Sequence, residues 1–253
     1  MSKREIVEYM GSEIVRERFA DALGNPGSAG AYVNSVLMAV ANSPNLQECT
    51  YESIYISALR AATLRLSCDP GTKQAWLVPY GKKAILIIGY KGLLDMAVRT
   101  GRYRYIHTDK LYVGENVEVD RFTGQIKLVG GKETNTVYGW LASFQMYDGY
   151  SKSIFMTVDE IHEHAKKYSK GYKSSDSAWK TAPEQMERKT ILRKLLMDWG
   201  YIDPADAALI EPSDDQSPED IPDIVADETI EGEVIETDET PEKILGQLGF
   251  GDA

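Results

Sequence analysis

The stretch AWLVPYGKKAILIIGYKGLLDMAVRT, residues 75–100, contains two strand patterns, a turn and a helix pattern in succession. Residues 75–80 and 83–89 are rich in apolar side chains and flank the dipeptide Gly81-Lys82, so they predict a β-hairpin. The second run is continuously apolar, which is typical of a strand that is buried on both faces. The apolar spacing then changes and predicts a helix over residues 90–100.

Three helices are predicted before this hairpin. The first covers residues 1–24 and ends at Asn25-Pro26-Gly27, the second covers about 30–42, and the third runs from near Thr50 to a stop at Asp69-Pro70-Gly71. Apolar residues of the first helix form two stripes spaced by four: Ile6, Met10 and Ile14, and Val15, Phe19 and Leu23. Two stripes suggest two packing partners, within the subunit or across an oligomer contact. We expect residues 1–48 to contribute oligomer contacts.

A β-rich stretch and two further helices are predicted after residue 100. Turns at 121–124 and 148–149 separate strands, and one half-buried strand has alternating apolar residues: Tyr138, Trp140, Ala142, Phe144 and Met146. The capping-box pairs Thr157/Glu160 and Thr181/Glu184 predict helices over about 158–167 and 182–199. This order predicts an α+β fold in which helices pack on an antiparallel β-meander.

The net charge of −11 is unevenly distributed. Residues 204–253 contain sixteen acidic side chains and one lysine, whereas residues 54–194 contain 23 basic and 14 acidic side chains. The middle of the chain is therefore basic, and an acidic C-terminal segment conceals this in the total. A basic surface can bind nucleic-acid phosphates.

The composition change near Pro204 predicts a core over residues 1–203 and a disordered acidic tail over 204–253. Residues 242–250 regain apolar character, and they form either a short partner-binding motif or a frayed chain end. No run of about 18 apolar residues predicts a membrane span, and the first residues lack a signal-peptide pattern. We expect a cytoplasmic protein.

The segment KKYSKGYKSSDSAWK, residues 166–180, mixes lysines with aromatic residues. Lysines neutralise phosphates, and aromatic rings stack on unpaired bases, so the segment suits single-stranded nucleic acid. A mobile solvated loop explains the same composition. The candidate contacts in this segment are Lys170, Lys173, Trp179 and Lys180.

The predicted helix 182–199 offers a second basic surface. Ile191, Leu192, Leu195 and Trp199 share its apolar face, whereas Lys189 and Arg193 project on the opposite side with Thr190 and Lys194. This opposite side is either a DNA contact or only a solvated face. Arg188 points toward the apolar side, where pairing with a buried carboxylate is an alternative to DNA contact.

A third basic cluster surrounds the predicted hairpin and the helix after it. Its members are Lys82, Lys83, Lys91, Arg99, Arg102 and Arg104. Such residues either bind phosphate or only increase solubility. Lys91 is the best-placed candidate, because a helix N-terminus already favours an anion.

Sequence signals for catalysis are weak. His162 and His164 are two residues apart on a predicted helix and cannot face one ligand, and no Walker or HExxH sequence is present. Cys49 and Cys68 lack the spacing of a zinc site. We expect a non-catalytic protein that requires no cofactor. A metal nuclease that uses scattered carboxylates such as Asp95, Asp109 and Asp120 is the alternative.

Four sequence pieces, in this order and at similar distances, resemble the RecT family of phage and prophage recombinases over about residues 50–200. They are Ala61–Leu66 followed by Asp69-Pro-Gly-Thr; Val78-Pro-Tyr-Gly81; Ile88-Gly-Tyr-Lys-Gly-Leu93; and Ala178-Trp179 before Met186, Lys189, Thr190 and Arg193. The family usually has Gly where Arg65 stands and Pro where Ala178 stands. These departures concern local turn geometry.

The resemblance implies a core distantly similar to that of Rad52-type annealing proteins, which assembles as a homo-oligomeric ring or helical filament on DNA. It also implies ATP-independent annealing of complementary single strands in phage-type recombination in the bacterial cytoplasm. A phage exonuclease and the host single-strand-binding protein are implied partners through the C-terminal region. Lys189, Arg193, Lys91 and residues near Trp179 would line the DNA groove. Modulation of DNA binding by Mg²⁺ is left open.

Overall fold

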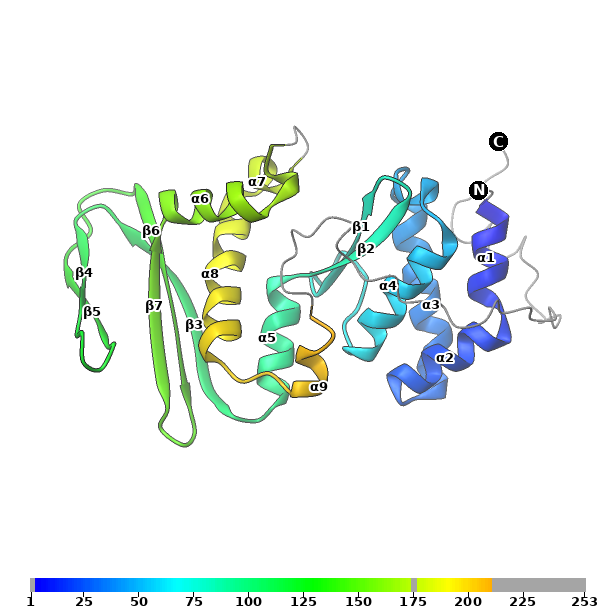
Figure 1. The fold of residues 1–253 in the computed structure, drawn as a ribbon, viewed down its shortest axis with the longest axis horizontal. Coiled ribbons are helices and arrows are strands. Elements are labelled where there is room, and N and C mark those ends of the chain that lie inside the picture. Colours follow the sequence, from blue (N-terminus) through cyan, green and yellow to red (C-terminus); the bar gives the residue numbers. More distant parts are fainter. Residues whose placement is uncertain (1–2, 174–176, 211–253) are drawn as a thin grey trace. The chain divides into compact units, whose positions relative to one another are not determined.

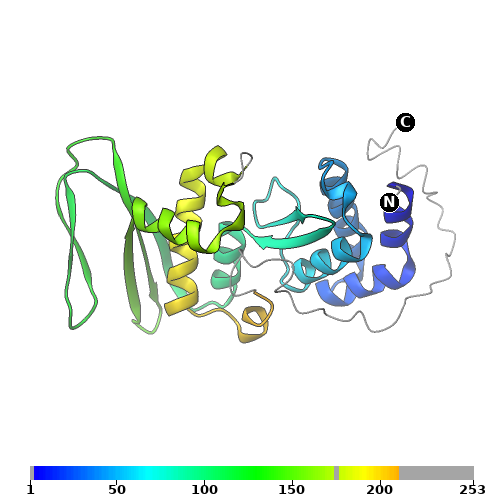
Figure 2. The ribbon, with the colours of Figure 1, turned by 45° about the horizontal axis from the view of Figure 1, so that its top comes forward.

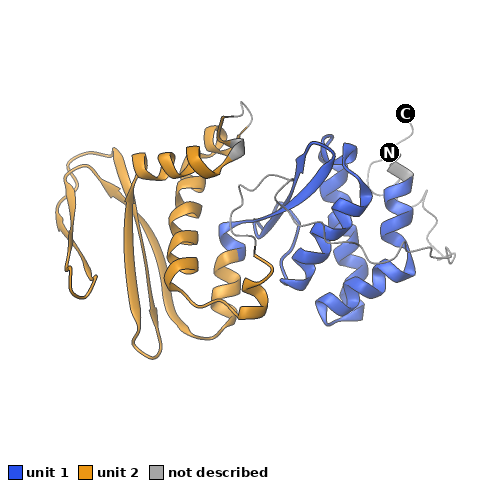
Figure 3. Ribbon diagram, viewed as in Figure 1, with its two compact units in different colours: residues 1–92, 218–253 blue, residues 93–217 orange. Residues whose placement is uncertain are grey.

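The computed structural model describes residues 3–173 and 177–210; for residues 3, 4, 170 and 171 it describes the backbone alone. The chain forms two compact units (Figure 3). Of the described residues, the first unit comprises 3–92, and the second comprises 93–173 with 177–210. Helix α5 (Tyr90–Arg99) begins in the first unit and ends in the second, and each of the other described helices and strands lies within one unit.

Helices and a β-hairpin form the described part of the first unit (Figure 1). The elements are α1 (Lys3–Gly11), α2 (Glu13–Leu23), α3 (Pro26–Ala41), η1 (Leu46–Glu48), α4 (Tyr51–Thr63), β1 (Ala75–Tyr80) and β2 (Lys83–Ile88). The helix predicted over 1–24 is broken at Ser12, whose extended backbone (ψ 149°) separates α1 from α2. The third predicted helix ends at Thr63, well before Asp69-Pro70-Gly71.

Both apolar stripes of the first 24 residues pack inside the first unit. Ile6, Met10, Val15 and Phe19 are all at most 2% exposed. The Phe19 ring lies 5.5 Å from that of Tyr32, on α3. The stripes are therefore largely used within one chain, and the predicted oligomer contacts of residues 1–48 do not follow from them.

The β1–β2 hairpin is confirmed with its two-residue turn. Tyr80 pairs with Lys83, and Gly81 takes the left-handed conformation (φ 59°) that favours glycine in such turns. Helix α4 packs against β2. Ile85 is buried on β2 but Leu86 and Ile87 are half-buried, so β2 is not fully covered on both faces as predicted.

Two glycines explain how β2 passes into α5 (Tyr90–Arg99). A Cβ atom on Gly89 would lie 2.4 Å from the carbonyl oxygen of Lys73, and one on Gly92 would lie 2.4 Å from that of Gln74. Real Cβ atoms do not come so close to backbone oxygens. Glycine is required here because one stretch of backbone passes directly against another.

The second unit is built on a three-stranded antiparallel sheet in the order β3-β6-β7. The strands are β3 (Tyr103–Tyr112), β6 (Val137–Met146) and β7 (Ser151–Thr157), with a separate hairpin of β4 (Glu115–Val119) and β5 (Ile126–Gly130) between β3 and β6. The helices are α6 (Val158–Tyr168), η2 (Lys170–Lys173), α7 (Ala178–Thr181), α8 (Pro183–Trp199) and α9 (Pro204–Ala207).

Helices α6 and α8 pack against β6 and β7 (Figures 1 and 2). The alternation predicted for β6 is confirmed, since Trp140, Ala142, Phe144 and Met146 are buried. The β4–β5 hairpin interrupts the meander, so β6 pairs with β3 across an insertion. Helices on an antiparallel sheet confirm the predicted α+β class.

One of the two predicted capping boxes is present. The Thr157 hydroxyl accepts from the backbone N–H of Glu160 at 3.1 Å, and the Glu160 carboxylate accepts from that of Thr157 at 2.8 Å. The second prediction is wrong: Thr181 is the last residue of α7, and Glu184 pairs with Lys110 instead. Helix α8 begins with Pro183, a residue suited to a first helical position.

The core extends beyond the predicted boundary at 203. Asp203 caps α9 by accepting from the backbone N–H of Ala205 at 2.9 Å. Ile210 is buried, so residues 204–210 are part of the fold. The remainder of the acidic segment, including residues 242–250, lies outside the described residues. Within the described ranges, no helix has the length and apolar character needed to cross a membrane.

Candidate nucleic-acid interface

Helix α8 packs its apolar face on the sheet and carries the candidate cations elsewhere. Its buried apolar residues are Ile191, Leu192, Leu195 and Leu196. Trp199, predicted on this face, is instead 47% exposed. Leu196 supplies the last buried apolar contact of the helix, and the Trp199 ring lies 4.0 Å from the Lys152 ammonium.

The cations of α8 differ in exposure. Lys189 and Arg193 are half-buried, whereas Lys194 is exposed and forms an ion pair with Asp198 at 3.0 Å. The Arg188 Nε donates to the hydroxyl of Thr108 on β3 at 2.8 Å. Lys189 and Arg193 therefore do not lie on a fully solvated face, and Arg188 binds the sheet.

Cations from α6 and α8 gather around His164. The pKa of His164 is lowered by partial burial of the ring and then by the nearby charges of Lys194, Lys167 and Arg193, while Asp198 opposes them. The His164 ring lies 4.7 Å from that of Tyr168. We call His164, Lys167, Arg193 and Lys194 the α6–α8 basic surface. It joins two clusters that the sequence presents separately.

The segment 166–180 is more ordered than a solvated loop wherever it is described. It contains the last turn of α6, then η2, and then α7 after the undescribed residues 174–176. Lys173 and Lys180 are exposed, as is Tyr168 at 42%. The side chain of Lys170 lies outside the described part.

Trp179 is predicted to stack on a nucleobase, but its ring is buried in the structure. It is only 7% exposed, and its Nε1 donates to the Ser169 hydroxyl at 3.2 Å. The rings of His162 and Tyr172 each lie 5.6 Å from it. These contacts leave the indole buried in this structure, and its predicted contact with DNA stays a prediction.

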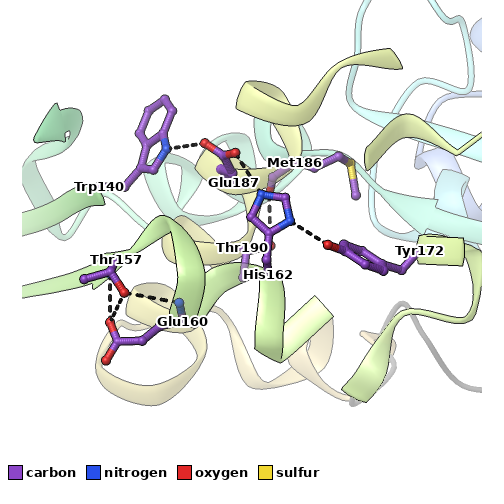
Figure 4. A network of polar contacts seen from close by, with 8 residues as sticks. All are labelled: Trp140, Thr157, Glu160, His162, Tyr172, Met186, Glu187 and Thr190. Atoms are coloured by element: carbon purple, nitrogen blue, oxygen red, sulfur yellow. Dashed lines mark hydrogen bonds and ion pairs between the residues drawn. The ribbon is translucent and has the colours of Figure 1, made fainter. Parts of the chain in front are cut away.

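A buried carboxylate that sequence reasoning missed connects this segment to α8 (Figure 4). Glu187, 7% exposed, accepts from Trp140 Nε1 at 2.7 Å, and its other oxygen lies 3.2 Å from His162 Nε2. His162 Nδ1 lies 2.8 Å from the Tyr172 hydroxyl.

The His162 imidazole bridges the Tyr172 hydroxyl at Nδ1 and the Glu187 carboxylate at Nε2. Four elements, β6, α6, η2 and α8, are thereby joined through hydrogen bonds. The one signal in the sequence was Trp140: a tryptophan on the core face of a strand needs an acceptor for its N–H.

The third basic cluster is divided between the units. Lys82 and Lys83 are exposed at the β1–β2 turn, and Lys91 is exposed as the second residue of α5, all in the first unit. Arg102 and Arg104 are exposed beside and within β3, in the second unit. A common groove that contains Lys91, Lys189 and Arg193 remains a prediction.

The metal-nuclease alternative gains no support. Asp95 lies 3.4 Å from Arg99, which also contacts Asp206 at 3.5 Å, and Asp120 accepts backbone hydrogen bonds in the β4–β5 turn. Among the described side chains, no group of three or more His, Cys, Asp or Glu could hold a metal ion.

Comparison with known proteins gives one family and two relatives. The model of the RecT family matches residues 30–220. The chain is 34% identical over 194 residues to the uncharacterized protein YqaK of Bacillus subtilis, an alignment that covers 76% of this chain and 66% of that protein. It is 25% identical over 202 residues to Protein RecT of Escherichia coli, covering 76% and 74%. The chain thus spans about two thirds of the length of the Bacillus relative.

Proposed function

The chain belongs to the RecT family, and from this we propose that it binds single-stranded DNA and anneals complementary strands in homologous recombination without hydrolysing a nucleotide. The family match over residues 30–220 is the observation that carries the proposal. The matched range includes α6, α8 and therefore the whole α6–α8 basic surface.

The charges on α6 and α8 support the binding step. Lys167, Arg193 and Lys194 lie close enough together to lower the pKa of one histidine between them. A surface with that positive potential attracts phosphates, and binding releases the counterions that the phosphates had condensed. The strand is held by its backbone, which leaves its bases free to pair.

Base pairing then supplies the free energy of annealing. The protein contributes by reducing repulsion between the two phosphate backbones and by raising the local concentration of strands. No step requires a bound nucleotide or a catalytic metal. We also propose that the protein acts as a homo-oligomer, either a ring or a helical filament. Its proposed partners are a phage exonuclease and the host single-strand-binding protein.

The test is an annealing assay on the full chain. Two complementary oligonucleotides with a fluorophore and a quencher are mixed with protein in EDTA and without ATP, and a non-complementary pair serves as control. The proposal requires faster quenching for the complementary pair alone. Binding to each strand without faster quenching would indicate a coating protein, and shortened strands after Mg²⁺ addition would indicate a nuclease; either result overturns it.

A further inference from the structure

Three exposed aromatic residues lie on the β6–β7 turn and in the last turn of α8. Tyr147 is 73% exposed, Trp199 47% and Tyr150 44%. Exposed aromatic residues on neighbouring segments are candidates for a binding surface. None of the three has a place in the α6–α8 basic surface.

Hydrogen bonds and ring contacts connect the β6–β7 turn to the chain at the end of α8. Tyr147 N–H donates to the backbone carbonyl of Arg102 at 2.9 Å, and the Arg102 guanidinium lies 3.8 Å from the centre of the Tyr201 ring. Tyr201 follows Trp199 by two residues. The Trp199 ring in turn lies 4.0 Å from the ammonium of Lys152, which is on β7.

Tyr103 and Phe144 connect this region to the core of the second unit. The Tyr103 hydroxyl donates to the Tyr201 carbonyl at 2.9 Å, and the Tyr103 ring meets the buried Phe144 ring edge-on at 5.4 Å. The Phe144 ring also lies 5.5 Å from that of Tyr150, in the β6–β7 turn. A Cβ on Gly200 would lie 2.6 Å from the Tyr103 oxygen, so the chain passes close against this anchor. A rigid platform loses little entropy when a ligand binds.

This region is separate from the α6–α8 basic surface although both use α8. Lys194 and Trp199 are five residues apart, which corresponds to a rotation of roughly 140° about the helix axis and a rise of about 8 Å. Trp199 faces Lys152 of β7, whereas Lys194 faces the His164 side. One helix thus presents two surfaces in two directions.

The chemistry of the region fits unpaired nucleobases. Aromatic faces stack on any base, and arginine and lysine beside them add cation–π contacts and phosphate neutralisation. The Arg102 guanidinium and the Lys152 ammonium lie over the Tyr201 and Trp199 rings, while Asp148 in the turn accepts from the Tyr150 N–H at 2.9 Å, Asp198 pairs with Lys194 and Asp203 caps α9. A protein partner would also use aromatic residues, but cations in direct contact with the rings favour an anionic ligand.

We propose that Tyr147, Tyr150 and Trp199, with Arg102 and Lys152, form a second contact for single-stranded DNA, the stacking surface, which binds unpaired bases while the α6–α8 basic surface binds backbone. This inference rests on the proposed function and deepens it. An annealing protein has to hold one strand by its phosphates and keep bases available to a second strand, and two surfaces of different chemistry allow both.

The experiment measures the affinity of the full chain for a fluorescent oligo-dT strand at several salt concentrations. In the variant Tyr147→Ala/Trp199→Ala, the affinity falls about tenfold or more, since stacking contributes on the order of 1–3 kcal/mol per base. The slope of log affinity against log salt stays the same, because stacking releases no counterions. Tyr147→Phe/Trp199→Phe, which keeps two rings, restores most of the affinity.

Phe122→Ala is the matched control, because Phe122 is fully exposed on the β4–β5 turn and has no place in the stacking surface. If the double variant is unstable, the affinity of Tyr147→Ala alone tests the inference, because this side chain is mostly exposed and its removal should not unfold the protein. Parental affinity in a folded variant overturns the inference, as does a change in oligomer size with unchanged DNA affinity. Failure of the parent chain to bind DNA would instead refute the proposed function.

Discussion

The carboxylate of Glu187 accepts a hydrogen bond from Trp140 Nε1 at 2.7 Å and so joins α8 to the central strand of the second unit. Glu187 precedes Lys189 by two residues on the same helix. The bond therefore fixes the helix that carries the candidate DNA-binding cations, and it does so from the buried side.

Removing this acceptor should weaken the fold. Glu187→Ala leaves the Trp140 N–H and the His162 Nε2 without their buried partner, and we expect the free energy of unfolding to fall by about 3 kcal/mol. Urea denaturation measures it. Glu184→Ala is the control, since Glu184 is exposed and its pair with Lys110 should contribute at most about 1 kcal/mol. Equal effects of the two substitutions would contradict the role given to Glu187.

The lowered pKa of His164 predicts a pH dependence of stability. The unfolded chain takes up a proton on this residue near pH 6.5 and the folded chain only at lower pH. The free energy of unfolding therefore falls as the pH falls from about 6.5 to the folded pKa, and His164→Asn removes this part. NMR titration gives the folded value directly. In Lys194→Ala the His164 pKa should rise; a pKa at or above 6.5 in the parent would show that the cations do not act on this ring.

Two glycines provide a matched pair for the packing argument. Gly92→Ala places a methyl group 2.4 Å from the Gln74 carbonyl oxygen, and overpacking of this kind costs about 1–3 kcal/mol. Gly30→Ala, inside α3, meets nothing within 4 Å and should stabilise the helix by about 0.5–1 kcal/mol. Thermal melting of both variants tests this. A Gly92→Ala variant that melts at the same temperature as Gly30→Ala would contradict the close approach of the two backbone segments.

Arg65 occupies a backbone conformation that favours glycine. Its φ of 55° lies in the left-handed region, where a side chain costs about 1–2 kcal/mol. Arg65→Gly should therefore raise the free energy of unfolding by about 1 kcal/mol, whereas Arg65→Ala should change it little. Denaturant titration of both variants distinguishes relief of strain from loss of the arginine. A destabilised glycine variant would contradict this.

The backbone conformations at Arg65 and Ala178 explain which residues the RecT family usually has at these two positions. Arg65 stands where the family usually has Gly, and its positive φ explains that preference. Ala178 stands where the family usually has Pro, and it is the first residue of α7 after the N-cap Ser177, a position in which proline is well tolerated.

Local patterns predicted the elements that local interactions determine. The β1–β2 turn, the alternation on β6 and the Thr157/Glu160 cap all depend on neighbouring residues, and all are present. The Thr181/Glu184 prediction failed because the same four-residue pattern occurs at the end of one helix and the start of another. The burial of Trp179 could not be predicted, since His162 and Ser169, which cover and bind it, lie on other elements.

In the candidate site, too, the sequence predicted local features but not contacts between residues that are distant in sequence. The cations of α8 were visible as a helical pattern, but the approach of Lys167 to Arg193 depends on how α6 packs beside α8. The sequence analysis did not single out Glu187, because its partners Trp140 and His162 are distant in sequence. The rings of the stacking surface come from a turn and a helix end about 50 residues apart, which no periodicity connects.

The most direct test of DNA binding by α8 is the salt dependence of single-strand affinity and annealing rate in Lys189→Ala/Arg193→Ala. Both residues are half-buried, so thermal melting has to confirm that the variant is folded. Lys194 belongs to the α6–α8 basic surface but is already paired with Asp198, so Lys194→Ala should reduce the affinity and the annealing rate less than the double substitution does.

We predict that the double variant loses annealing and that its log–log salt slope becomes shallower by roughly 1.4, about 0.7 for each lost phosphate contact. A folded double variant with the parental annealing rate and the parental slope would show that Lys189 and Arg193 make no contact with DNA phosphates, and would contradict DNA binding by α8.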